Sequence, residues 1–166
     1  MPEKKTLARA RKDAREGKAP STQAGEFVRE EMEHIREGKH GARSAKQAIA
    51  IGLSKARRAG VKLPPPKEGK VSESTRNQAA RNYAQGQTSP DRATSPTRSR
   101  AVKKALQREG KQAASHLALS RQANASTRSR SAASRSRAAQ KAVHTKGKAG
   151  LRRAAQKAAR TRKRER

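Results

Sequence analysis

Two segments near the N-terminus carry apolar side chains at the spacing of an amphipathic helix. In the first segment these residues lie at offsets of 0, 3, 4, 8 and 11 and are Ala24, Phe27, Val28, Met32 and Ile35. In the second segment the offsets are 0, 3, 4, 7, 8 and 11, and the residues are Ala45, Ala48, Ile49, Gly52, Leu53 and Ala56. Residues three and four apart share one face of an α-helix, so each segment is predicted to form a helix with one apolar stripe.

Capping residues indicate where these two helices begin and end. Ser21 or Thr22 offers an N-cap for the first helix, and Gly38 suits a left-handed C-cap. Ser44, with Gln47 three residues later, fits a capping box for the second helix. The glycine at 60 and the prolines at 64–66 end it. Because the connection is short, we expect an antiparallel helical hairpin over residues 21–60.

The segment that precedes the hairpin has a weaker pattern. Residues 3–16 are good helix formers, but Leu7 is their only sizeable apolar residue. Isolated helices of this length are marginal in water, so a solvated or fraying helix is expected there. The N-terminal helical unit as a whole is predicted to cover residues 1–63.

The two helices of the hairpin differ in charge. The first carries five glutamates against two arginines, and the second has basic residues only: Lys46, Lys55, Arg57 and Arg58. This contrast favours pairing of the helices, although exposed ion pairs contribute only about 0–1 kcal/mol each. A unit of about 40 residues with so few apolar side chains usually needs a metal, a disulfide or oligomerisation. The chain has no cysteine, so we expect the hairpin to form a homodimer or to pack on another partner.

The hairpin sequence also resembles a known family. The residues that carry the resemblance are Gly25–Val28, Gly38–Gly41 and Ser44–Gly60, which includes the run KQAIAIGLSKARRAG. They are similar to a family of small basic bacterial proteins of unknown function. The resemblance covers about residues 1–63 and implies a bacterial source, but it brings no activity and no functional residues with it.

Residues 64–100 are rich in Pro, Ser, Thr, Asn and Gln, so a disordered linker is predicted. The linker contains a Ser-Pro doublet, Ser89–Arg92 and Ser95–Arg98. This pattern is similar to the Ser-Pro-basic turns of linker-histone tails, which bind the minor groove. Ordinary turns are the alternative interpretation, and phosphorylation of Ser89 or Ser95 is left open.

From residue 101 onward the chain consists largely of Ala, Lys, Arg, Ser and Gln. The run RAAQKA occurs at 137–142 and again at 153–158, with Gly147 and Gly150 between the copies. These residues are strong helix formers, but repulsion between the cations is expected to keep the segment open until an anion binds. The predicted fold class is therefore mostly α with extensive disorder: a short hairpin followed by a disordered, helix-competent basic tail over residues 101–166.

Charge determines the functional expectation. The chain of 166 residues has 43 Lys+Arg against 13 Asp+Glu, a formal net charge of +30. No acidic residue occurs between Gly110 and Arg164. A long cationic block binds polyanions by releasing condensed counterions, without reading sequence. The tail composition is also similar to linker-histone C-terminal domains. The expected nucleic-acid contacts are Lys111, Arg121, Arg128, Arg130, Arg135, Arg137, Lys141, Lys146, Lys148, Arg152, Arg153, Lys157, Arg160, Arg162, Lys163 and Arg164.

The remaining motifs suggest little chemistry. Gly38-Lys39-His40-Gly41 is a basic joint that could hold a phosphate, although the strands of a KH domain are missing from the pattern. The four histidines are scattered without partners at ligand spacing, so no metal, no cofactor and no small-molecule substrate are expected. No nucleophile motif, acid–base pair or P-loop appears, and the protein is expected not to be an enzyme.

The sequence thus predicts a histone-like, nucleoid-associated architectural protein that binds DNA without sequence preference. An RNA-binding or ribosome-associated protein is the first alternative. A protein-interaction module centred on the hairpin is the second, and a helix-turn-helix using residues 44–58 is a variant of it. The charged start of the chain lacks a secretory pattern, and the tail lacks a membrane-binding apolar face. We therefore expect a cytoplasmic protein that does not bind membranes.

Overall fold

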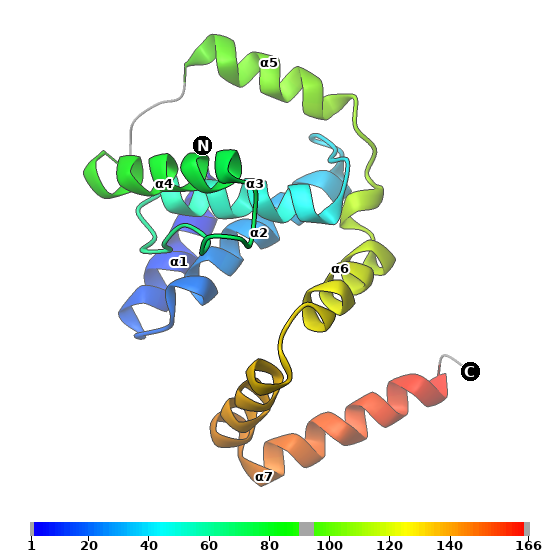
Figure 1. The fold of residues 1–166 in the computed structure, drawn as a ribbon. Coiled ribbons are helices and arrows are strands. Elements are labelled where there is room, and N and C mark those ends of the chain that lie inside the picture. The colour runs from blue at the N-terminus through cyan, green and yellow to red at the C-terminus, as the bar shows by residue number, and fades with distance from the viewer. Residues whose placement is uncertain (1, 90–94, 165–166) are drawn as a thin grey trace. The chain divides into compact units, whose positions relative to one another are not determined.

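The computed structural model describes residues 2–89 and 95–164, and helices account for most of them (Figure 1). The chain divides into two units, Met1–Gln122 and Ala123–Arg166. The elements are α1 (Lys4–Arg15), α2 (Pro20–Glu37), α3 (Ala45–Arg58), α4 (Glu73–Thr88), α5 (Pro96–Gln107), the 3₁₀-helix η1 (Gln112–Ala114), α6 (His116–Arg128) and α7 (Ala132–Arg164).

The prediction of extensive disorder is wrong. The region expected to be a disordered linker contains α4 and α5, and the expected disordered tail contains α6 and α7. Ser72 caps α4, because its Oγ accepts a hydrogen bond from the Thr75 amide at 3.4 Å. In the tail, the high helix propensity of Ala, Arg, Lys and Gln outweighs the repulsion between cations. Part of the Ser-Pro doublet, residues 90–94, lies outside the described residues, and Pro96 is the first residue of α5.

Helices α2 and α3 pack against each other in the region of the expected hairpin. The apolar stripes of α2 and α3 face each other, and the large side chains of Phe27 and Ile35 on α2 are fully buried. Gly38 adopts the left-handed conformation at φ 80°. The Ser44 Oγ accepts a hydrogen bond from the Gln47 amide at 3.2 Å, while the Gln47 Oε1 accepts one from the Arg43 amide.

The start of α2 differs from the prediction. The helix begins at Pro20 with Ala19 as N-cap, and no side chain caps it. Proline suits the first helical position because its fixed φ is helical and its missing N–H would have no partner there. The proline therefore sets the boundary in place of Ser21 or Thr22.

The expectation of a fraying N-terminal helix is also wrong. Helix α1 packs against α2 and buries Thr6, Ala10 and Asp13. Leu7 joins the apolar cluster formed by Ala10, Ala24, Phe27, Ala56 and Val61. Small residues provide most of this contact, which hydrophobic periodicity does not detect.

Helix α3 lies between α2 and α4, and glycines allow both close approaches (Figure 1). A Cβ atom on Gly52 would lie 2.7 Å from the Val28 Cα of α2. A Cβ atom on Gly86 of α4 would overlap the Arg57 carbonyl of α3. Two backbones can approach this closely only where one residue has no side chain.

The segment after α5 covers the other end of the hairpin. The Gly41 amide donates to the Leu106 carbonyl at 2.9 Å, and the Ala42 amide donates to the Gly110 carbonyl at 3.1 Å. Ala113 and Ala114 of η1 are buried against Met32 and Ile35. The hairpin is thus covered by α1, α4 and η1 of its own chain. The predicted homodimer has correspondingly less apolar hairpin surface to use.

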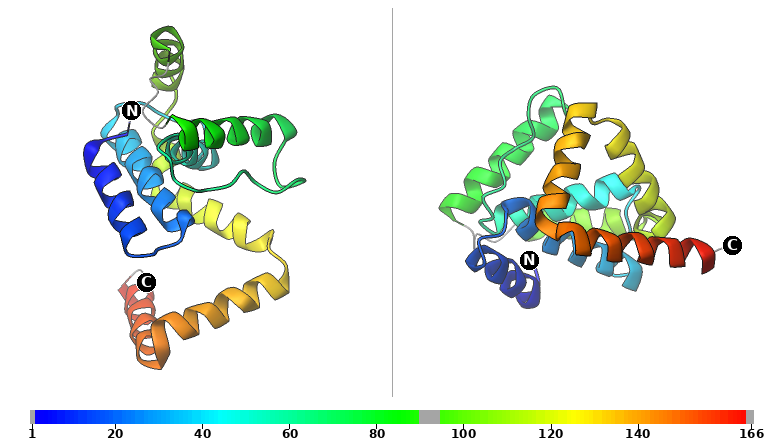
Figure 2. Two further views of the ribbon diagram at one scale, coloured as in Figure 1. Left: turned by 90° about the vertical axis from the view of Figure 1, so that its left-hand side faces the viewer. Right: turned by 90° about the horizontal axis from the view of Figure 1, so that it is seen from below.

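In the second unit, α7 is two helical segments joined at Gly147 (Figure 2). This glycine has φ 63° and ψ 173°, which is not helical. One copy of the RAAQKA run lies in each segment. Over residues 2–89 and 95–164, no helix combines the length and the apolar character needed to cross a membrane.

Candidate functional site

The structure contains two groups of charged residues. One group is exposed to solvent, and the other is built around buried carboxylates. The first group is the set of sixteen basic residues predicted to contact nucleic acid. All sixteen are exposed, and twelve of them belong to α7. The other four are Lys111 before η1, Arg121 and Arg128 on α6, and Arg130 in the turn before α7.

One side of the C-terminal segment of α7 carries no cation. At 100° per residue, Gly150, Leu151, Ala154 and Ala158 fall on one side of the helix. Lys157 and Arg162 lie at the two edges of that side, and the other basic residues spread over the rest of the surface. Within the described part of the chain, no carboxylate lies within ion-pair distance of these cations. The helix therefore presents a dense cationic surface to solvent.

The predicted phosphate loop, Gly38-Lys39-His40-Gly41, has most of its donors in use. The amides of Gly38, Lys39 and Gly41 donate to backbone carbonyls. The Lys39 Nζ lies 2.9 Å from Glu37 Oε2 and 3.2 Å from Glu3 Oε1. These two carboxylates raise the pKa of Lys39, with Glu37 the larger influence. The loop as folded directs its lysine to carboxylates.

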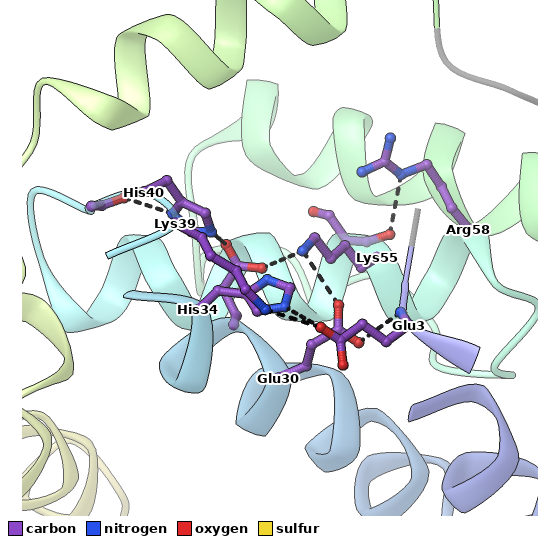
Figure 3. Close-up of polar contacts among 10 residues, drawn as sticks. Glu3, Glu30, His34, Lys39, His40, Lys55 and Arg58 are labelled. Atoms are coloured by element: carbon purple, nitrogen blue, oxygen red, sulfur yellow. Dashed lines mark hydrogen bonds and ion pairs between the residues drawn. The ribbon is translucent and has the colours of Figure 1, made fainter. Parts of the chain in front are cut away.

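The second group is a cluster that the sequence analysis missed. We call it the carboxylate–histidine cluster, and Figure 3 shows most of it. Its members lie at the junction of α2, the 38–44 connection and α3: Glu3, Glu30, Glu31, His34, Lys39, His40 and Lys55.

Two glutamates form the buried part of this cluster. Glu30 is 1% exposed and Glu31 is 0% exposed. From α3, the Lys55 Nζ approaches Glu31 Oε2 at 2.6 Å and Glu30 Oε1 at 3.7 Å. The Glu30 Oε2 accepts a hydrogen bond from the Glu3 amide at 3.1 Å. A buried carboxylate is costly unless it is paired, so Lys55 and the Glu3 amide hold these charges in place.

The histidines complete the cluster. The His34 Nε2 lies 2.8 Å from Glu3 Oε1, and the His40 Nε2 lies 3.1 Å from Glu31 Oε1. The hydrogen bond from His34 is the main reason that the pKa of Glu3 is lowered, and Lys39 adds to the effect. One ligand atom from each of Glu31, His34 and His40 lies within 4.8 Å of the others. The conclusion that the histidines lack partners is therefore wrong for His34 and His40.

A signal for this cluster exists in the sequence. Glu31 occupies offset 7 of the apolar stripe that begins at Ala24, between Phe27 and Ile35. A glutamate in the middle of an apolar stripe predicts a buried carboxylate that needs a partner. His34 follows it at a spacing of three, on the same face of the helix. The tertiary contacts of His40 and Lys55 had no comparable signal.

Arg57 is a second basic residue with a structural role. It is 6% exposed, and its Nε and Nη2 donate to the Leu63 and Pro64 carbonyls at 3.2 and 3.4 Å. Burial lowers the pKa of its guanidinium. Arg57 holds the proline-rich turn against the end of α3, so it does not contribute to a basic surface.

Comparison with known proteins relates one part of the chain to a family. Residues 17–68 match the model of a family of unknown function (DUF6496). The match covers the hairpin, the carboxylate–histidine cluster apart from Glu3, and the turn that follows α3. It agrees with the expected resemblance to an uncharacterised family. The match leaves the tail out, and nothing found supports its resemblance to linker histones. No curated protein and no solved structure matches the chain.

Proposed function

We propose that the protein binds nucleic acid, with DNA as its main partner, and acts as an architectural, nucleoid-associated protein. The observation that carries the proposal is α7, whose twelve Lys and Arg residues are all exposed and whose sequence contains no Asp or Glu. Each phosphate that such a residue neutralises releases condensed counterions, so binding is strong at low salt and independent of base sequence. In this respect the tail would act as linker-histone tails do.

The helical state of the tail sharpens the mechanism. A tail that is already helical loses less conformational entropy when it binds than one that must fold first. The bend at Gly147 divides α7 into two cationic segments. Each segment can contact a separate stretch of backbone, on one duplex or on two, which would bring duplexes together.

Two aromatic residues bear on the kind of nucleic acid. Phe27 is fully buried and Tyr83 is partly buried, and the chain has no other Phe, Tyr or Trp. Proteins that bind single strands usually stack bases on exposed aromatic rings. This composition favours contact with duplex backbone over recognition of unpaired bases.

Fluorescence anisotropy with the full chain tests the proposal. A labelled duplex and a scrambled duplex of equal length are titrated over a range of salt concentrations. We expect equal affinities and a steep linear fall of log K with log[salt]. A flat salt dependence, or a strong preference for one duplex, would overturn the sequence-independent mechanism. Crosslinking in cells, with separate sequencing of bound DNA and RNA, decides between the two partners, and recovery of RNA alone would overturn the DNA assignment.

A further inference from the structure

We infer that Glu31, His34 and His40 form a binding site for a divalent transition-metal ion of the Zn²⁺ class. Two imidazoles and one carboxylate are a ligand set typical of such ions. The three side chains come from two turns of α2 and from the connection that follows it. This inference does not rest on nucleic-acid binding, because none of the three residues belongs to the basic tail.

The first argument is the state of the Glu31 carboxylate. It is fully buried, yet its Oε1 accepts no hydrogen bond of regular geometry within the described residues. Oε2 also accepts no hydrogen bond of regular geometry, but the Lys55 ammonium lies 2.6 Å away as its ion-pair partner. Among the described residues, the ion-pair partner of Oε1 is the His40 Nε2, at 3.1 Å. A buried carboxylate oxygen in this position calls for a cation.

The second argument is the arrangement of the His40 ring. Its Nδ1 lies 3.0 Å from the Gly41 carbonyl oxygen, which can only accept, so Nδ1 carries a proton. In the tautomer that this contact selects, Nε2 carries a lone pair and lies 3.1 Å from the Glu31 Oε1, which is also only an acceptor. Two acceptors 3.1 Å apart repel each other unless a proton or a metal ion lies between them. A metal ion shared by Nε2 and Oε1 resolves the contact.

The distances fit such an ion. Ligand atoms at about 2.0–2.1 Å from a tetrahedral Zn²⁺ are roughly 3.3 Å apart. The His40 Nε2 and Glu31 Oε1 already have close to this separation, at 3.1 Å. The ligand atom of His34 lies within 4.8 Å of both. The His34 ring would have to move closer to His40 and Glu31 to enter the first coordination sphere, and a water molecule would supply the fourth ligand.

Outer residues are in place to orient the ligands. The Glu3 carboxylate accepts a hydrogen bond from His34 Nε2, which leaves Nδ1 of the neutral ring with a free lone pair (Figure 3). Histidine ligands in metalloproteins usually donate their second N–H to a carboxylate or a carbonyl. Glu3 does this for His34, and the Gly41 carbonyl does it for His40. Lys55 holds the other oxygen of Glu31, so Oε1 is the ligand atom.

The local charge is compatible with a divalent ion. The carboxylates of Glu3, Glu30 and Glu31 face the ammonium groups of Lys39 and Lys55. With neutral histidines these five groups sum to −1, so an added divalent ion leaves the cluster at +1 in place of an unpaired negative charge. A bound ion would fix the end of α2 to the 38–44 connection.

Metal titration of the full-length protein tests the inference. The protein is first freed of nucleic acid and treated with a chelator. Co²⁺ is then added while the visible absorption is followed, and Zn²⁺ is added to displace it. We expect one saturable equivalent, with ligand-field bands that disappear as Zn²⁺ binds. Zn²⁺ should also raise the Tm of the wild-type chain, because it binds only the folded state.

Matched histidine variants localise the ion. His34→Gln and His40→Gln should each weaken Zn²⁺ binding by at least about 10- to 100-fold, the loss usual even for an outer-sphere residue. His116→Gln and His144→Gln are the controls, because both residues are exposed and lie on α6 and α7. Circular dichroism of each variant verifies that its helices are retained. Equal losses in the control variants, or no saturable Co²⁺ spectrum in the wild type, would overturn the site.

A measurement on the unmodified chain covers the case in which a variant does not fold. The ring ¹⁵N resonances of all four histidines are recorded with and without one equivalent of Zn²⁺. We expect the ligating nitrogens of His34 and His40 to shift, while those of His116 and His144 stay in place. Shifts at all four histidines, or at none, would contradict the proposal.

Discussion

Basic residues have different physical roles in the two units of this protein. In the first unit, Lys55 and Arg57 are largely buried and pair with carboxylates or carbonyls of the fold. In the second unit, the cations of α7 are exposed and have no described carboxylate within ion-pair distance. The first arrangement uses charge to position helices, and the second leaves it available to a polyanion. Residue type alone does not tell the two roles apart, because burial and local partners decide them.

The largest effect should come from neutralising part of the exposed set. Four substitutions to Gln, at Arg152, Arg153, Lys157 and Arg160, should lower the slope of log K against log[salt] by up to about 0.9 for each lost phosphate contact. At 50 mM salt the affinity should fall by roughly 10²-fold or more. Anisotropy titrations measure both quantities.

The matched control removes the same charge from the first unit. Lys4, Lys5, Arg11 and Arg15 are exposed residues of α1 and are changed to Gln. If the tail carries the binding, this variant should keep nearly the full salt slope. Equal losses in both variants would mean that net charge matters and its position does not.

The next effect concerns the close contact of α2 and α3. Gly52→Ala places a methyl group 2.7 Å from the Val28 Cα, and backbone atoms cannot move aside as a side chain can. We expect a loss of about 1–3 kcal/mol in the free energy of unfolding, the usual cost of overpacking. Gly25→Ala on α2 is the control, since its Cβ would meet nothing within 4 Å. That change should stabilise the helix by up to about 1 kcal/mol, and urea denaturation measures both.

A smaller effect is expected at Arg57. Arg57→Met removes the donors to the Leu63 and Pro64 carbonyls but also removes a buried charge. We expect a net loss of about 1–2 kcal/mol from the unpaired carbonyls. Arg58→Met is the comparison, because that half-exposed side chain bonds only within its own helix, and it should change stability by less than about 0.5 kcal/mol. Similar effects for the two variants would contradict a structural role for Arg57.

The smallest effect concerns the exposed turn between α1 and α2. The Lys18 Nζ lies 2.7 Å from Asp13 Oδ1 and 2.7 Å from Glu16 Oε2. These contacts raise the pKa of Lys18, and the hydrogen bond from Lys18 lowers the pKa of Glu16. Because the pKa of Glu16 is lowered in the folded state, its ion pair stabilises the protein at pH values above about 4.3, the pKa in the unfolded chain. This stability is lost at lower pH. Because the pKa of Lys18 is raised in the folded state, its contacts stabilise the protein at pH values below about 10.4. This stability is lost at higher pH.

Lys18→Met should therefore lower the Tm slightly between these two pH limits. The part of the difference that comes from Glu16 should disappear as this carboxylate becomes protonated in acid. Thermal melts at pH 3, 7 and 9 measure it. A difference as large at pH 3 as at pH 7 would contradict a contribution from Glu16.

The sequence predicted the hairpin well because its signals are local. Apolar residues at offsets of three and four, a capping box at Ser44 and a glycine at 38 specify the helices without reference to the rest of the chain. Helix α4 gave no such signal. It packs against α3, and its buried residues are Ala79, Asn82 and Gly86, which share a face but include no large apolar side chain. A contact built from small residues depends on how closely two backbones approach, and that distance is a tertiary property.

The same reason separates the two candidate sites. The sequence by itself determined the basic tail, because an excess of cations over carboxylates needs no fold to be counted. Only the tertiary structure showed that His40 and Lys55 converge on Glu31, since this depends on how the α2–α3 hairpin closes. The structure also decided which cations are buried, because desolvation by neighbouring helices is a property of packing and not of composition.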